Sequence, residues 1–255
     1  MKNTLIVSKF TFIEVYRSKV MMSIVFMALA LVLITYIASE FAYGAPVKVA
    51  LDFGLGVMTL SNFGMAIFIG STLLTKEVEQ RTLYMILSKP ISRTNFLCGK
   101  VIGLSSVLAI NTIVLSGLAI GIYLFLGGKF QSLILWASFF TFLEAFLLLL
   151  FAVLFSLITN TAMAVIYSII ILIIGHSLNE TSKLIFAKMN VYFNNAVKVG
   201  NILLPNFYKL NLKDFVLYQQ TVSTDYLYNV FIYYILYFTA LSIIVVQIFK
   251  NKNLD

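Results

Sequence analysis

Six long apolar stretches divide this sequence, and they limit the folds that it can adopt. An α-helix rises about 1.5 Å per residue, so roughly 20 apolar residues cross the ~30 Å hydrocarbon core of a bilayer. The stretches are Val20–Ile37, Leu51–Leu74, Val101–Leu126, Leu133–Ile158, Thr161–Leu178 and Leu227–Phe249. With 61% hydrophobic and 11% charged residues, against about 45–50% and about 25% in soluble domains, the chain needs lipid as its solvent.

Within the hydrocarbon core these stretches must be helices or the strands of a closed barrel, because lipid offers no partner to an unpaired backbone group. Barrel strands alternate apolar and polar residues over segments of about ten. Here the stretches contain continuous apolar runs, such as Leu147–Leu150 and Ile169–Ile174. We therefore predict an all-α membrane protein of about six transmembrane helices, folded as a single domain over residues 1–255.

Positive charge is distributed unevenly between the connecting segments. Lys and Arg gather in the N-terminal segment, in the loop of residues 75–100 and in the C-terminal tail. With six spans these segments lie on one side of the membrane, and the positive-inside rule makes that side, and both termini, cytoplasmic. The outer loop, residues 179–226, also carries five lysines, but the rule is weak for long loops. The net charge of +8 is thus a topology signal, and we expect membrane lipids rather than nucleic acid as partners.

Two segments outside the spans are rich in apolar or aromatic residues. Thr4–Lys19, drawn as a helix, has a broad apolar arc that includes Leu5 and Phe10, and small polar residues such as Thr11 lie opposite. This pattern favours a helix in the cytoplasmic interface; the alternative is an extension of the first span. The outer loop combines lysines with aromatic residues, so we expect short interfacial helices broken at Pro205, with a solvated loop as the alternative.

The loop of residues 75–100 has the most distinctive sequence. Glu77 and Arg81 are four residues apart and can pair on a helix that continues the second span. Pro90 disfavours a helical residue before it and ends that helix, and Ser92 can cap a second helix that runs into the third span. The predicted result is a charged helical elbow on the cytoplasmic side, able to transmit force from a cytosolic partner into two spans.

The spacing of residues in this elbow resembles the first cytoplasmic loop of ABC-2 type transporter permeases, and among them the subgroup associated with maturation of multi-copper enzymes. Ile86 stands where that family usually has leucine. The matching positions are Glu77, Glu79, Thr82, Leu83, Ser88, Pro90, Ile91, Ser92, Arg93, Phe96, Gly99 and Lys100. The motif covers about a tenth of the chain and indicates no particular substrate.

The resemblance implies a division of labour between subunits. A separate ATPase subunit, carrying ATP and Mg²⁺, would dock on the elbow, and two permease copies, identical or different, would form the pathway in a bacterial inner membrane. This chain would be non-catalytic, and neither Gly99-Lys100 nor Gly128-Lys129 has the flanking residues of a phosphate-binding loop. Arg93 and Lys100, seven residues apart, would share one face at the ATPase interface. The residues expected to couple to the ATPase are Glu77, Glu79, Arg81, Thr82, Ser88, Pro90, Arg93 and Lys100.

Polar residues inside the predicted spans are the other candidates. Glu144 lies near the middle of the fourth span, where a carboxylate is costly and is a functional hypothesis by default. It could line the pathway, hydrogen-bond to Asn111 of the third span, or simply pack between helices. Because His176 is the only histidine and there is a single cysteine, we expect no metal site and no cofactor on this chain. Gly117 and Gly121 form a G-x-x-x-G pair, which favours packing within one subunit, with a subunit contact as the alternative.

Together these observations favour the permease subunit of an ATP-driven exporter. Two other functions stay open at this point. The first is a membrane mechanotransmitter or scaffold, which would use the same ATPase to act on periplasmic partners without moving a substrate. The second is an ATP-independent channel or carrier, which would need more intramembrane polar groups than Glu144 and Asn111 supply.

Overall fold

The computed structural model describes residues 2–18, 20–42, 44–79, 92–183, 200 and 204–251. Regular structure in this part of the chain is entirely helical, and six of its helices are long and apolar enough to cross a membrane. The six are α2 (Val20–Phe41), α3 (Pro46–Glu79), α5 (Arg93–Phe125), α6 (Ser132–Ile158), α7 (Thr161–Lys183) and α11 (Thr224–Asn251). The predicted all-α fold with six candidate spans is confirmed.

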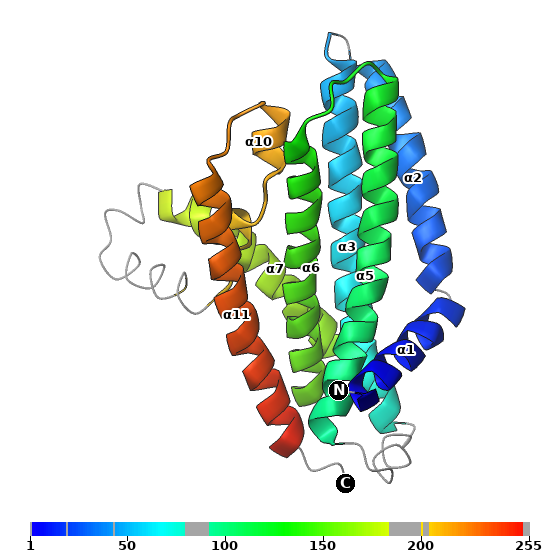
Figure 1. Cartoon of the computed structure of the whole chain (residues 1–255), viewed down its shortest axis with the longest axis vertical. Helices are drawn as coiled ribbons and strands as arrows, with labels where there is room; N and C mark the ends of the chain where they lie inside the picture. The colour runs from blue at the N-terminus through cyan, green and yellow to red at the C-terminus, as the bar shows by residue number, and fades with distance from the viewer. Residues whose placement is uncertain are drawn as a thin grey trace.

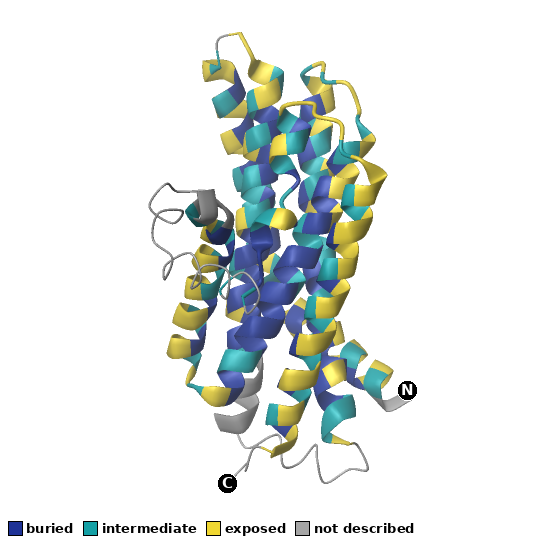
Figure 2. Cartoon of the chain, turned by 90° about the vertical axis from the view of Figure 1, so that its left-hand side faces the viewer, coloured by how far each residue is buried: buried dark blue, intermediate teal, exposed yellow. Residues whose placement is uncertain are grey.

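The long helices run alternately up and down, so that both chain termini lie at the same end of the molecule, the lower end in Figure 1. α3 packs against α2, α5 and α6, and α6 also contacts α7 and α11, which places α3 and α6 at the centre. Figure 2 shows buried residues along this centre and exposed residues on the outward faces. Fully buried side chains include Met58 of α3, Leu108 of α5 and Leu148 of α6.

Two of the long helices, α3 and α5, extend well beyond the apolar stretches that predicted them. α3 has 34 residues and α5 has 33, so each is ~50 Å long against a hydrocarbon core of about 30 Å. The apolar stretches end where charged residues begin, but a helix continues as long as its backbone hydrogen bonds do. At the start of α5 the Ser92 hydroxyl accepts a hydrogen bond from the Asn95 backbone N–H at 3.3 Å, which confirms the predicted cap.

The N-terminal segment forms a separate helix, α1 (Lys2–Arg17), inclined to the bundle at its lower end, rather than an extension of α2 (Figure 1). Its buried face consists of Val7, Thr11 and Val15, and α1 packs against α5. The predicted apolar arc points outward, with Leu5 64% and Phe10 67% exposed. The side that carries small polar residues is therefore the side in contact with protein, because small side chains let two helices approach closely.

Two glycines at the lower end of α5 allow this approach. A Cβ atom at Gly103 would lie 2.7 Å from Thr11 Cβ and 2.8 Å from the Ser8 carbonyl oxygen, and one at Gly99 would lie 2.7 Å from Val7 Cβ. Gly117 and Gly121, the G-x-x-x-G pair predicted to pack within the subunit, lie further along α5. A Cβ atom at either position would meet no described atom within 4 Å. The close helix contact within the subunit therefore uses the first pair of glycines and not the predicted pair.

The described part of the outer loop folds into the bundle. It contains two short elements, η1 (Phe207–Lys209), a 3-10 turn, and α10 (Lys213–Leu217). The Phe207 side chain is fully buried, since Gly175 of α7 leaves room for it: a Cβ atom at Gly175 would lie 2.5 Å from the Phe207 ring. The Phe207 ring thus packs against α7. The rest of the loop, residues 184–199 and 201–203, lies outside the described residues.

We predict that Gly103→Ala destabilises the protein and that Gly117→Ala does not. The methyl group at residue 103 would overlap α1 and cost about 1–3 kcal/mol, the usual effect of overpacking. The same change at residue 117 meets open space and is expected to be neutral or slightly stabilising, because Ala is the better helix former by about 1 kcal/mol. Thermal unfolding of the two purified variants in detergent tests this, and equal melting temperatures would contradict the packing of α1 on α5.

Candidate functional site

A layer of polar side chains crosses the middle of the bundle and joins α3 to α5. Asn111 of α5 donates from Nδ2 to Asn62 Oδ1 at 2.8 Å and to Ser61 Oγ at 3.1 Å, both on α3. The Thr112 hydroxyl donates to Asn62 Oδ1 at 3.1 Å. All four side chains are buried. Because lipid tails cannot replace these hydrogen bonds, the layer holds α3 and α5 in one register.

A second polar contact in this layer joins α6 to α7. Glu144 Oε1 and His176 Nε2 lie 3.1 Å apart, within the distance of an ion pair but without the alignment of a hydrogen bond. His176 Nδ1 lies 3.2 Å from the Leu172 carbonyl oxygen. A carbonyl only accepts, so the contact at Nδ1 is a hydrogen bond when Nδ1 carries the proton, and in the neutral ring this leaves Nε2, an acceptor, facing Glu144.

Aromatic rings enclose His176 on two sides. The ring of Phe63, on α3, and the ring of Phe207, in η1, each have their centroid 5.9 Å from that of the imidazole. Phe63 directly follows Asn62 on α3. Asn62 hydrogen-bonds to Asn111 of α5, and the Phe63 ring packs against His176 of α7. Four spans and the outer segment therefore meet at one level of the bundle.

Two buried polar atoms of this layer, Asn62 Nδ2 and Glu144 Oε1, make no hydrogen bond within the described part of the chain. A buried polar group without a partner costs about 1–3 kcal/mol, and native structures keep few of them. Both atoms are available to a water molecule, to a bound molecule or to a second arrangement of the helices. This makes the polar layer the candidate functional site within the membrane.

A different set of polar contacts lies at the lower end of the molecule, where the elbow meets α5. The Lys100 side chain is only 6% exposed, and its Nζ lies 3.2 Å from Glu14 Oε2 on α1. Arg93 Nη1 donates to the Lys250 carbonyl oxygen of α11 at 3.0 Å. These contacts join α1, α5 and α11 beside the elbow, so a displacement of the start of α5 would reach two other helices.

The residues expected to couple to an ATPase fall into three groups. Glu77 and Glu79 belong to the last turn of α3, and the structure describes their backbone but not their side chains. Arg93 and Lys100 contact different helices: Arg93 contacts α11 and Lys100 contacts α1. The remaining four lie outside the described residues and are Arg81, Thr82, Ser88 and Pro90.

Some of these contacts could not be foreseen from the sequence. Glu144 and Asn111, weighed as partners, belong to separate contacts, with His176 and Asn62 respectively. The sequence did contain a signal for the Asn62 contact: Asn62 is a second asparagine inside a span, and polar residues in spans usually pair with one another. Nothing in the local sequence marked Glu14 as the partner of a lysine 86 residues away. In the part of the chain that the structure describes, no cluster of three or more His, Cys, Asp or Glu side chains could hold a metal ion.

We predict that Asn111→Ala lowers the free energy of unfolding by about 1–2 kcal/mol, because inside the membrane it leaves Ser61 Oγ without its donor and leaves Asn62 Oδ1 with Thr112 as its remaining donor. The control is Ser116→Ala on the same helix, whose half-buried hydroxyl donates to the Ile113 carbonyl oxygen within α5 and not to another helix of the described part. The measurement is thermal unfolding in detergent. If both variants melt at the native temperature, the asparagine layer does not hold α3 against α5.

The Glu144–His176 pair should behave differently from the asparagine layer. His176→Phe alone is expected to cost about 1–3 kcal/mol, since it leaves the Glu144 carboxyl group buried without its polar neighbour. The double variant Glu144→Leu with His176→Phe should recover the native stability or exceed it, because replacing a buried pair with apolar groups is often neutral or stabilising. A double variant that is as unstable as the single one would show that the pair maintains the fold.

Comparison with known proteins identifies the family of this protein. The family model described as "ABC-2 family transporter protein" matches residues 10–228, which include the elbow, the polar layer and five of the six long helices in full. Membrane proteins of this family are typically non-catalytic permeases. A comparison with curated proteins gives no match. Because the match covers most of the chain and the structure has the six candidate spans, this protein belongs to the ABC-2 family of transporter proteins.

Proposed function

We propose that this chain is the permease subunit of an ABC exporter and that a separate ATPase subunit, which binds ATP and Mg²⁺, drives it. The observation that carries the proposal is the family match over residues 10–228, because ABC-2 permeases in general work with an ABC ATPase. The chain has no phosphate-binding loop of its own, so energy would reach it through a protein contact. The elbow motif further points to the subgroup associated with multi-copper enzyme maturation.

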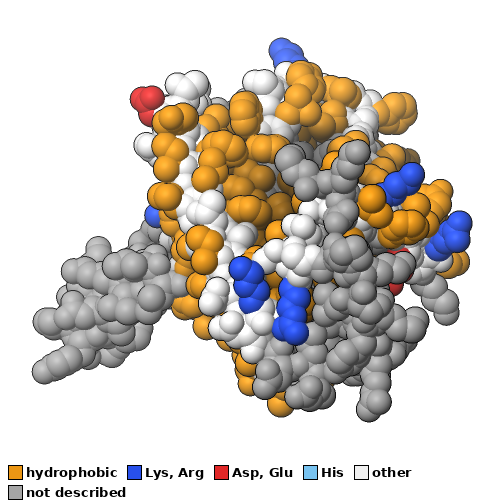
Figure 3. Space-filling view, turned by 60° about the horizontal axis from the view of Figure 1, so that its bottom comes forward, with side chains coloured by type: hydrophobic (Ala, Val, Ile, Leu, Met, Phe, Trp, Pro, Cys, Tyr) orange, Lys and Arg blue, Asp and Glu red, His pale blue; other side chains and the backbone are white. Residues whose placement is uncertain are grey.

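The ATPase would bind at the lower end of the molecule. Both termini lie at this end (Figure 1), and Lys and Arg side chains appear on the described part of the same face in Figure 3. Arg17 of α1 and Lys250 of α11 are both exposed. By the positive-inside rule this end is cytoplasmic, which would put η1 and α10 on the outer side. The outer Lys213 is paired with Asp52 of α3, so its charge is compensated there.

The elbow would receive the motion of the ATPase. It connects the lower ends of α3 and α5, two helices that pack directly against each other. Glu77 and Glu79 would dock in a groove on the ATPase, and closure of the ATPase pair would push both helices. Because Lys100 holds α1 and Arg93 holds α11, the displacement would extend to those helices as well.

The polar layer would respond to that displacement. Glu144 and Asn111 sit on two of the central helices, and each is part of a contact that joins two spans. A shift of α3 against α5 would change which polar atoms are satisfied, so the layer could line the pathway or switch between two arrangements. A second permease copy would complete the pathway, and Gly117 and Gly121 on the open face of α5 offer it a close-approach surface.

We predict that the tagged protein, purified from its native host in mild detergent, carries a P-loop ATPase with it. The double change Glu77→Lys and Glu79→Lys should reduce the recovered ATPase at least tenfold, because it reverses the charge expected at the docking surface, and a tenfold loss corresponds to about 1.4 kcal/mol of binding energy. Mass identification of the co-purified chains, with an ATPase assay, is the measurement.

The matched control reverses two charges at the other end of the molecule, with Glu40→Lys on α2 and Asp225→Lys on α11. Both residues are exposed, and the change in net charge is the same. This variant should retain the ATPase. Equal recovery from both variants would reject docking through Glu77 and Glu79, and purification without any ATPase in several detergents would favour an ATP-independent channel or carrier.

A further inference from the structure

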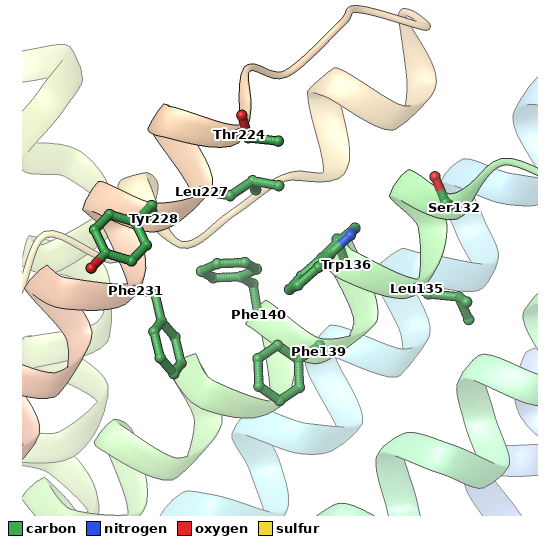
Figure 4. Close-up of a pocket in the computed structure, with 9 residues that line it drawn as sticks. All are labelled: Ser132, Leu135, Trp136, Phe139, Phe140, Thr224, Leu227, Tyr228 and Phe231. Carbon is green, nitrogen blue, oxygen red and sulfur yellow. The ribbon is translucent and has the colours of Figure 1, made fainter.

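A wide groove separates the upper ends of α6 and α11, and Figure 4 shows its two walls. Its volume is 830 Å³, within the range of about 300–1,000 Å³ that ligand pockets occupy. Nine residues line it: five are aromatic, two are leucines (Leu135 and Leu227), and the other two are Ser132 and Thr224. The aromatic residues are Trp136, Phe139 and Phe140 from α6, and Tyr228 and Phe231 from α11.

The groove opens sideways, away from the core of the bundle. Trp136 is 46% exposed and Tyr228 67% exposed, although both belong to helices that could span the membrane. Hydrocarbon chains and not water surround the middle of such helices, and Trp and Tyr are enriched where those chains meet the headgroups. The molecules with direct access to this apolar hollow are therefore the lipids beside it.

The two aliphatic hydroxyl side chains of the lining, those of Ser132 and Thr224, lie at one end of the groove. In Figure 4 the Ser132 and Thr224 hydroxyls lie at its upper rim, at the first residues of α6 and α11, and the rings of Phe139 and Phe231 lie toward the other end. This change takes place over about two helical turns. A phospholipid matches it, because a polar headgroup is attached to a long apolar chain. A transmembrane helix from a second copy matches it less well, since such a helix is apolar over its whole membrane-spanning length.

We propose that this groove binds one acyl chain of a phospholipid from the half of the membrane opposite the elbow, with the headgroup beside Ser132 and Thr224. The acyl chain lies along the aromatic walls and fills the space between α6 and α11. This site goes beyond the proposed ATP-driven function and does not depend on it. The elbow is at the other end of the molecule, and the test below needs no ATPase.

The protein supplies its own reporter, because Trp136 is the only tryptophan in the chain. Bromine atoms quench indole fluorescence only at close range. The probe is a phosphatidylcholine with one dibrominated acyl chain, added to the full-length protein in a detergent with a steroidal tail, so that no alkyl detergent competes. We expect quenching that saturates with added probe and that the same lipid without bromine reverses.

Two variants of α11 distinguish the groove from the general lipid surface. Leu227→Phe narrows the groove and should weaken the apparent affinity at least fivefold. Ile232→Phe adds the same ring at an exposed position that does not line the groove, and it should leave the affinity unchanged. A third protein, with Trp136→Phe and Leu33→Trp on the exposed face of α2, reports quenching by lipid in general and should show no saturation.

Three results would overturn the proposal. Quenching of Trp136 that rises without saturation, as for the tryptophan on α2, would mean contact with bulk lipid only. The absence of quenching would mean that another chain, such as a second copy, covers the groove. Equal effects of Leu227→Phe and Ile232→Phe would place the bound chain elsewhere on α11.

Discussion

Lipid offers no hydrogen bonds to a polypeptide, and the structure depends on this constraint at every level. The backbone of each span must satisfy its own N–H and C=O groups, which makes the spans helical. The polar side chains within the spans must then find each other: Asn111 donates to Asn62 and Ser61, and Glu144 lies beside His176. Contacts of this kind are rare in the bundle, and for that reason they fix which faces of the central helices meet.

Hydropathy located the spans well because burial in lipid is a property of a whole stretch, to which about 20 residues contribute. It located the helix ends less well. α5 begins at Arg93, well before the apolar stretch that starts at Val101, since backbone hydrogen bonding does not end where charge appears. The Ser92 cap was predictable because a cap depends on residues three apart in the chain.

Contacts between distant segments were not predictable in the same way. Two G-x-x-x-G pairs lie on α5, and among the described residues the pair of Gly99 and Gly103 packs against another helix, while the pair of Gly117 and Gly121 does not. The sequence of α5 alone does not distinguish them, because the difference lies in where α1 is placed. The same holds for Lys100, a charged residue in the elbow motif that is buried against Glu14 of α1. A motif can identify a family without giving the contacts of each residue within it.

The position of the asparagine pair along its two helices has a mechanical consequence. Asn62 is 16 residues from the start of α3 and 17 from its end, and Asn111 is 18 and 14 residues from the ends of α5 (62−46, 79−62, 111−93, 125−111). The bonded pair is thus close to the midpoint of two rods that are each ~50 Å long. If the rods tilt about this point, it acts as a fulcrum with nearly equal arms. A tilt of about 10° would then move both ends by roughly 4 Å in opposite directions, so that a push at the elbow returns at the far surface with almost the same amplitude.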